Sequence, residues 1–263
     1  MDLKYYVVDA FADGPFTGNP AGVCLLEEPL SAELMQKIAA QNNLAETAFV
    51  CQNGDDYDLR WFTPATEINL CGHATLASAF VLHNFARKQE EYKFHTMSGL
   101  LTVRPQGDLF EMDFPAWPVQ PVEITELMQQ AVGCDILEAH AARDLLLVLE
   151  NEAAMRAVTP DFAAMIEIPD YHGVVATTAK TESCEGCDFV SRVFAPKVGI
   201  PEDHVTGSVH SELIPFWAAR LGKDKLLARQ LSRRGGTLYC ENRGGRVNIA
   251  GKARLYLTGE IYV

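Results

Sequence analysis

The sequence predicts two related α/β halves, because one pattern occurs in the chain twice. In the first half, Phe62-Thr63-Pro64 is followed by Cys71-Gly72-His73, and in the second, Phe194-Ala195-Pro196 is followed by Thr206-Gly207-Ser208. Each copy begins with an apolar, strand-like run and continues after its glycine into a helix-like run. A length of 263 residues suits two domains of about 110 to 150 residues each.

The repeated glycine turns precede helices that we expect over residues 74–87 and 209–221. The first backbone N–H groups of a helix have no partner within it, and the helix dipole is positive at that end, so such a turn favours an anion. Two turns facing one substrate would hold a small carboxylate. We therefore expect substrate-binding groups at Gly72 and Gly207.

The elements of the first half follow from periodicity and turn residues. Ser31 is expected to cap a helix that ends near Asn42. Alternating apolar residues predict strands, which we place at residues 5–11, 22–26, 44–51, 58–62 and 109–114.

Pro115, Pro118 and Pro121 mark the boundary between the halves, because proline donates no hydrogen bond to a sheet. The last portion, 235–263, should form short β segments broken by glycines. Before it we expect helices at 124–132 and 161–166, and strands at 145–149, 173–178 and 189–194.

Charge and hydropathy exclude several classes of function. The formal net charge of −13 argues against nucleic-acid binding, which needs Lys and Arg clustered over a broad face. The chain begins without a signal-peptide pattern and holds no run of about 18 apolar residues, so we expect a cytoplasmic protein that does not enter a membrane.

The cysteines indicate reduced thiols and no metal site. There are 7, an odd number at no regular spacing, which fits a disulfide framework poorly. Cys184-Glu185-Gly186-Cys187 is the only C-x-x-C, and a structural zinc site would need a second ligand pair. We expect neither a metal nor an organic cofactor.

Glu46 is the acid that we expect to carry the chemistry. It lies in an apolar, strand-like segment, where a period of two puts it on the face of Ala48 and Val50. A carboxylate among apolar neighbours loses hydration of its charged form, which suits a group that both takes and gives a proton. The alternative is an acid at a strand end, exposed or paired with an arginine. Counted from the Phe-x-Pro motifs, the matching position in the second half is about Thr178, which is not an acid.

His73, Ser208 and Asp203 are the other expected catalytic residues. His73 follows Gly72 at the start of the first repeat helix, and the matching place holds Ser208, also a hydrogen-bond donor. Asp203 is the second candidate acid. The alternative roles are structural, with His73 as a polar group at a helix start and Asp203 as a cap of the following turn.

Cys71 and Thr206 occupy matching places before the repeated glycines and are expected in the substrate-binding site. Two cysteines would indicate a two-base racemase, but threonine does not ionise usefully, so Cys71 is expected to be a small packed residue. The turn over residues 18–22 could supply further N–H groups, from Gly18 and Asn19.

Together, these motifs resemble those of the PhzF-like (phenazine-biosynthesis) family, in an order that spans nearly the whole chain. The resemblance implies a diaminopimelate-epimerase-like α+β fold: two pseudo-symmetric α/β domains, residues 1–116 and 117–263, each a curved, mostly antiparallel sheet or barrel around a central helix. It also implies an active site in the cleft between the domains. The motifs are Val8-Asp9-Ala10-Phe11, Gly18-Asn19-Pro20-Ala21-Gly22-Val23, Glu46-Thr47-Ala48-Phe49, Phe62-Thr63-Pro64, Cys71-Gly72-His73-Ala74-Thr75, and Glu202-Asp203 with Thr206-Gly207-Ser208.

For the founding member, the resemblance implies a cofactor-free isomerase that moves a proton and a double bond on a dihydro-hydroxyanthranilate. The residue matching Glu46 is then the general acid/base, and those matching His73, Asp203 and Ser208 orient the substrate or help to protonate it. In one departure from the family pattern, His204 stands where proline usually follows the aspartate. In another, the run after Ser208 resembles a branch whose substrates are largely unassigned.

The sequence therefore predicts a cofactor-independent isomerase that shifts a proton or double bond on a small carboxylate-bearing metabolite. The alternatives are an amino-acid epimerase or racemase, and a non-catalytic small-molecule binding protein on the same fold. The expected partner is a small anionic metabolite, and a homodimer is left open.

Overall fold

A computed structural model of the chain describes residues 1–179, 181–182 and 185–263. They form two compact units, one of Met1–Asp113 with Ala250–Val263 and one of Phe114–Ile249. The expected second half ran to residue 263, whereas the last segment belongs to the first unit. The reason is an antiparallel ladder with the N-terminal strand, in which Asp2 pairs with Tyr262 and Ala10 with Ala253.

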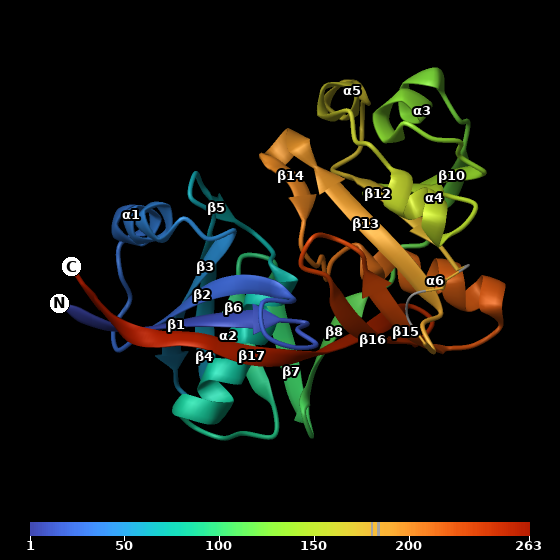
Figure 1. Cartoon of the computed structure of the whole chain (residues 1–263). Helices are drawn as coiled ribbons and strands as arrows, with labels where there is room; N and C mark the ends of the chain where they lie inside the picture. The colour runs from blue at the N-terminus through green and yellow to red at the C-terminus, as the bar shows by residue number, and fades with distance from the viewer. Residues whose placement is uncertain (180, 183–184) are drawn as a thin grey trace. The chain divides into compact units, whose positions relative to one another are not determined.

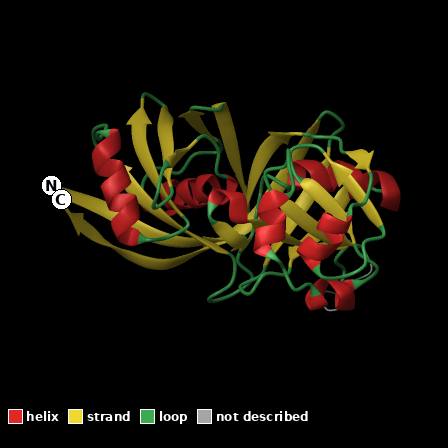
Figure 2. Cartoon of the chain, turned by 90° about the horizontal axis from the view of Figure 1, so that it is seen from above, coloured by secondary structure: helices red, strands yellow, loops and turns green. Residues whose placement is uncertain are grey.

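The strands of the first unit pair in a closed ring. The order is β17, β1, β2, β3, β4, β6, β7, β8 and back to β17, with β2–β3 and β4–β6 as parallel pairs. The two chain ends lie side by side in this unit (Figures 1 and 2). Its elements are β1 (Asp2–Ala10), β2 (Asn19–Leu26), α1 (Ala32–Asn42), β3 (Glu46–Asn53), β4 (Asp56–Phe62), β5 (Glu67–Ile68), α2 (Gly72–Phe85), β6 (Tyr92–Thr96), β7 (Gly99–Gln106), β8 (Leu109–Pro115) and β17 (Arg246–Tyr262).

Helix α2 is the central helix of this unit. It contacts β1, β2, β3 and β7, and residues 72–79, 81 and 82 are buried, so its first three turns are apolar on nearly all sides. Helix α1 covers the other face of the sheet, where Met35 and Ile38 pack against Phe49. The predicted cap is confirmed, since Oγ of Ser31 accepts a hydrogen bond from the N–H of Leu34 at 3.3 Å.

The second unit is a sheet covered by helices on both faces. Its strands pair in the order β9, β10, β11, β12, β13, β15, β16, and β14 also pairs with β13. Helix α6 packs on β15 and β16, and Nε1 of its Trp217 donates a hydrogen bond to Oγ1 of Thr177. The elements are β9 (Gln120–Val122), α3 (Glu126–Val132), β10 (Glu138–Ala141), β11 (Leu145–Val148), α4 (Glu152–Ala157), α5 (Phe162–Glu167), β12 (Val174–Thr178), β13 (Phe189–Ala195), the 3₁₀ helix η1 (Pro196–Val198), β14 (Ile200–Asp203), α6 (His210–Leu221), β15 (Lys225–Gln230) and β16 (Gly236–Asn242).

The predicted α+β class is confirmed, but one expectation about its strands is wrong. Residues 246–262 form one continuous strand, β17, that passes through Gly251 without a break. A Cβ atom at Gly251 would lie 2.3 Å from Cδ1 of Phe11. This glycine therefore makes room for a buried aromatic ring and does not end a strand.

The cysteines differ in part from the prediction. Cys24, Cys51, Cys71, Cys134 and Cys240 are free thiols, whereas Cys187 takes part in a disulfide bond. Cys184 of the C-x-x-C motif lies outside the described residues. Within the described ranges, none of the helices has the length and apolar character needed to cross a bilayer.

Candidate active site

Glu46 is the first residue of β3, next to Ala21 of the parallel strand β2. Only 5% of this residue is exposed, so the exposed acid that was the alternative is excluded. Alternation along β3 directs Glu46 away from the face on which Phe49 and Cys51 pack with helix α1. The carboxylate therefore lies on the face of α2.

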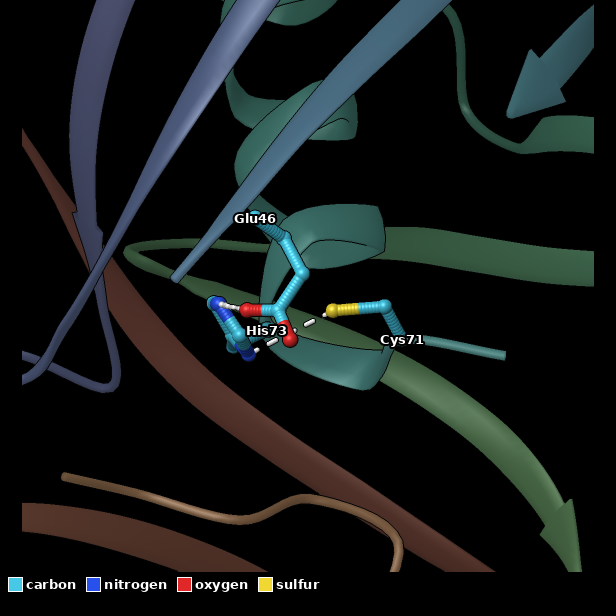
Figure 3. A group of neighbouring side chains, drawn as sticks. All are labelled: Glu46, Cys71 and His73. Carbon is cyan, nitrogen blue, oxygen red and sulfur yellow. Dashed lines mark hydrogen bonds and ion pairs between the residues drawn. The ribbon is translucent and has the colours of Figure 1, made fainter. Parts of the chain in front are cut away.

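His73, the second residue of α2, is the partner of this acid. Oε2 of Glu46 lies 3.0 Å from Nε2 of His73, and each side chain is 7% exposed (Figure 3). Apart from this contact with each other, neither atom has a hydrogen-bond partner among the described residues.

The neighbours of His73 favour the positively charged form of its ring. Burial acts to lower its pKa, but charge and hydrogen bonds from Cys71 and Glu46 outweigh burial and hold the pKa well above its usual value. Burial and the charge of Glu46 raise the pKa of the Cys71 thiol. Cys71 and Glu46 therefore both favour the positive ring, each in its anionic form.

The other ring nitrogen of His73 faces two further residues that the sequence singled out. Nδ1 lies 3.5 Å from Sγ of Cys71 (Figure 3). It also lies 3.4 Å from Nδ2 of Asn19, a fully buried residue. A positive ring donates from Nδ1, so the amide oxygen of Asn19 would then face it, an orientation compatible with the same side-chain position.

The start of α2 completes this cluster. Cys71 is the N-cap residue and makes no side-chain capping bond, so Gly72 and His73 present backbone N–H groups that no side chain caps. Gly18, directly before Asn19, has φ of +76°, and a Cβ there would lie 2.4 Å from the carbonyl oxygen of Ala10. Only glycine fits this turn. The first unit thus brings together Gly18, Asn19, Glu46, Cys71, Gly72 and His73.

In the second unit, a turn gathers Asp203, Thr206, Gly207 and Ser208. The hydroxyl of Thr206 donates a hydrogen bond to Oδ2 of Asp203, close to the capping role that was its structural alternative. Gly207 is buried and Ser208 is half-buried, directly before Val209, the N-cap residue of α6, which also lacks a side-chain capping bond. Unlike at the start of α2, the N–H groups of His210, Ser211 and Glu212 bond to the backbone carbonyls of Gly207, Ser208 and Val209.

Sequence reasoning missed Gln230, which holds this turn in place. Its Oε1 accepts the N–H of Thr206 at 2.8 Å, and its Nε2 donates to the carbonyl of Asp203 at 2.9 Å and to Oγ1 of Thr206 at 3.2 Å. Gln230 is fully buried at the end of β15. No local motif marks it, because its partners come from another part of the chain.

His210 is a second missed residue, close in sequence to Ser208. Nδ1 of His210 donates to the carbonyl oxygen of Thr206 at 2.8 Å. Burial lowers the pKa of His210 to about 4, so the ring is neutral and acts as a fixed hydrogen-bond donor.

Strand register corrects the expected counterpart of Glu46. Thr47 pairs with Phe62 in the first unit, and Val174 pairs with Phe194 in the second. The position that matches Glu46 is therefore Gly173, not Thr178. Counting along the chain failed because the connection from β12 to β13 is much longer than that from β3 to β4. The matching strand position still holds no acid.

Glu46, Cys71 and His73 also form a group whose ligand atoms lie within 4.8 Å of one another, as a metal site requires. Zinc accepts all three residue types. Nε2 of His73 faces Glu46, and Nδ1 faces Cys71. An ion bound by all three residues would use one of these two nitrogens.

Known proteins share this sequence and this fold. Residues 8–259 match the family model described as phenazine biosynthesis-like protein. An uncharacterized isomerase of Pseudomonas aeruginosa is 48% identical, with 100% of both chains covered, and one of Halalkalibacterium halodurans is 39% identical, with 99% of both covered.

Solved structures agree with these relatives. The crystal structure of a PhzF-family phenazine biosynthesis protein of Enterococcus faecalis covers 100% of both chains, with 46% identity and a TM-score of 0.97. A hydroxyproline epimerase of Agrobacterium vitis shares the fold at 10% identity and a TM-score of 0.61, with 99% of this chain and 92% of that chain covered. The names of the relatives confirm the predicted enzyme class, an isomerase. The chain belongs to the phenazine biosynthesis-like family.

Proposed function

We propose that this isomerase works without a cofactor and shifts a proton and a double bond on a small carboxylate-bearing metabolite. The buried pair of Glu46 and His73 is the observation that carries the proposal. It places an acid/base group beside a fixed positive charge, where little water competes for either.

In the proposed reaction, the Glu46 carboxylate takes a proton from a substrate carbon next to an unsaturated bond. The electron pair of the broken C–H bond forms a new double bond, and the electrons of the old double bond move to the carbon beyond it. Glu46 then returns its proton to that carbon. Atoms and electrons balance, and no oxidant or reductant takes part.

His73 supplies the charge for this step. Nε2 of the imidazolium lies 3.0 Å from Oε2 of Glu46, close enough to pair with the carboxylate before it accepts a proton. When the proton moves to Glu46, negative charge develops on the substrate, and the same imidazolium stabilises it. His73 thus serves the acid/base group and the intermediate in turn.

We assign substrate binding to the uncapped helix starts at Gly72 and Gly207, with Ser208 and Asp203 as orienting groups. Support comes from the sequence repeat and from the lack of a side-chain cap at either helix start. Asp203 accepts a hydrogen bond from Thr206, and a carboxylate can accept from more than one donor, including a donor group of a substrate.

An epimerase or racemase is the second candidate, favoured by the Cys71 thiol 3.5 Å from His73. A two-base epimerase needs an ionisable group at the matching place of the second unit, where Thr206 has its hydroxyl engaged with Asp203. The observation on Thr206 favours the single acid/base Glu46. A protein that only binds its ligand would catalyse no exchange at all.

The deciding experiment is deuterium wash-in from heavy water into small unsaturated carboxylates, followed by NMR. Wild type should exchange one carbon-bound hydrogen of a substrate. Glu46→Gln keeps the shape but removes the exchangeable proton, so wash-in should fall by roughly 10²-fold or more while binding persists. Glu33→Gln, at an exposed acid of α1, serves as the matched control.

Cys71→Ala separates the candidates. The isomerase proposal expects a mild effect, because the thiol has no ionisable counterpart in the second unit. Loss of wash-in with Cys71→Ala but not with Glu46→Gln would overturn the assignment in favour of an epimerase. Wash-in by none of the proteins, with binding intact, would identify a binding protein.

A further inference from the structure

We propose that the first unit carries a second ligand site, separate from Glu46 and His73, for a small amphipathic amine. The site is a cavity of about 450 Å³ between helix α1 and the ends of strands β3, β4 and β6. Ligand pockets of proteins commonly measure about 300 to 1,000 Å³. This inference does not depend on the proposed reaction.

The cavity and the candidate active site lie on opposite faces of the same sheet. Phe49 and Cys51 of β3 line the cavity, together with Met35 of α1. Residues of a strand alternate between its faces, so Glu46 and Ala48 point the other way. A molecule bound in the cavity would therefore lie on the other side of the sheet from a substrate bound at Glu46.

The body of the cavity is apolar, and its charged groups come from β4 and β5. Both oxygens of Glu67 accept hydrogen bonds from Arg60, at 2.6 and 2.7 Å, and the guanidinium also lies 5.3 Å from the ring centre of Phe62. The positive charge of Arg60 is thus neutralised by Glu67 in a bidentate ion pair. This pair adds no net charge to the cavity.

Asp58 is the other acidic residue of the cavity lining. It is half-buried, and Oδ1 accepts a hydrogen bond from Nδ2 of Asn53 at 3.0 Å, which engages one of its two oxygens. His95, also in the lining, is half-exposed and pairs with Asp56 outside the cavity at 3.1 Å. Asp58 is therefore a carboxylate of the cavity wall for which the described residues supply no ion-pair partner.

The thiol of Cys51 responds to this negative charge. Burial raises its pKa, and the carboxylates of Asp58 and Glu28 raise it further. An anionic ligand would meet the same repulsion, whereas an ammonium group would be attracted. The apolar wall selects a hydrocarbon body, and Asp58 selects a cationic nitrogen at one end of it.

The reactivity of the Cys51 thiol can be used to measure whether a ligand occupies the cavity. We would alkylate the folded, full-length protein with N-ethylmaleimide and follow each cysteine by peptide mass spectrometry, with and without n-hexylamine. Hexylamine should slow the reaction of Cys51 about fivefold once its concentration is about four times the dissociation constant. Cys134, a half-buried free thiol of the second unit, is the internal control and should react at an unchanged rate.

Matched probes separate the parts of the proposal. Hexanoate has the same chain with the opposite charge, and n-hexanol has no charge. Neither should protect Cys51 at concentrations where hexylamine does. Equal protection by all three probes would overturn the assignment to amines, and no protection by hexylamine would overturn the site itself.

Two variants test the charges. Asp58→Asn should weaken protection by hexylamine about tenfold, through loss of a charge-assisted hydrogen bond. Asp108→Asn, at an acid whose side chain is 88% exposed and outside the cavity lining, should have no effect. Glu67→Gln releases the charge of Arg60 and should shift the preference toward hexanoate. An unchanged preference in both cavity variants would contradict the proposal.

Discussion

Oε2 of Glu46 lies 3.0 Å from Nε2 of His73, so a strand start and a helix start meet as an acid and a base. Both side chains are buried, and each is partly stabilised by the charge of the other. The protonation state of each side chain therefore depends on that of the other.

His73 should be an imidazolium at pH 7, because its pKa is held well above the usual value. A histidine with a raised folded pKa adds stability that is fully present below its unfolded pKa and is lost as pH rises through the folded pKa. Glu46→Gln should lower the pKa of His73, since it removes the neighbouring anion. ¹⁵N NMR of the imidazole nitrogens checks this, and a His73 that is neutral at pH 7 in wild type would refute it.

Glu212 should also make the stability of the protein depend on pH. It is fully buried in α6, and Oε1 accepts the N–H groups of Arg143 and Asp144 at 3.1 and 3.0 Å. Burial and the nearby charge of Asp144 raise the pKa of Glu212 to about 8. The folded state therefore holds a proton that the unfolded state releases near pH 4.5.

Stability should consequently fall as pH rises from about 4.5 to about 8, by at most about 1.4 kcal/mol per pH unit for this one proton. Glu212→Gln keeps an oxygen for the two N–H groups and should flatten this part of the curve. Urea unfolding of both proteins across this pH range measures the difference. A difference that does not change with pH would show that Glu212 is ionised in the folded state.

Small carboxylates should stabilise the protein through the helix start at Gly207. Each helix end contributes on the order of 0.3 to 1 kcal/mol to anion binding, so millimolar carboxylates should raise Tm. Replacing the buried Gly207 with valine should reduce that rise. Gly14→Ala is the control, because a Cβ there meets no atom within 4 Å. An undiminished response in Gly207→Val would place the anion elsewhere.

Gln230→Ala should destabilise the second unit and loosen the turn at Thr206. The substitution removes three hydrogen bonds from a fully buried position, and unpartnered groups of this kind cost about 1 to 3 kcal/mol each. Gln36→Ala, which removes one hydrogen bond to the carbonyl of Thr63, should cost less. Chemical denaturation compares the two, and equal losses would contradict a special role for Gln230.

Much of the fold could be predicted from the sequence, because its signals are local. The Ser31 cap and the αL residue Asn43 delimit α1 within a few positions, and helix α2 follows its glycine as expected. The candidate acid at the start of β3, the histidine of α2 and the buried Asn19 were all marked by turns and alternation. These features depend on residues close together in the chain.

Other features only the tertiary structure decided. Gln230 carries no local signal, and its role comes from hydrogen bonds to a turn more than twenty positions away. Gly173 replaces Thr178 as the counterpart of Glu46, because pairing between strands sets the register while loop length sets the count along the chain.

The sequence by itself determined most of the helices, many of the strands, the repeat and the family motifs, since hydrophobic period, caps and turns act over a few residues. Strands β6, β7 and β10 and helix α4 were not predicted. The tertiary structure decided that Gly251 accommodates Phe11 inside a continuous strand, that the C-terminal strand joins the first unit, and that Glu46 meets His73. These outcomes depend on packing and hydrogen bonds between residues far apart in the chain, and such long-range contacts leave no periodic trace in the sequence.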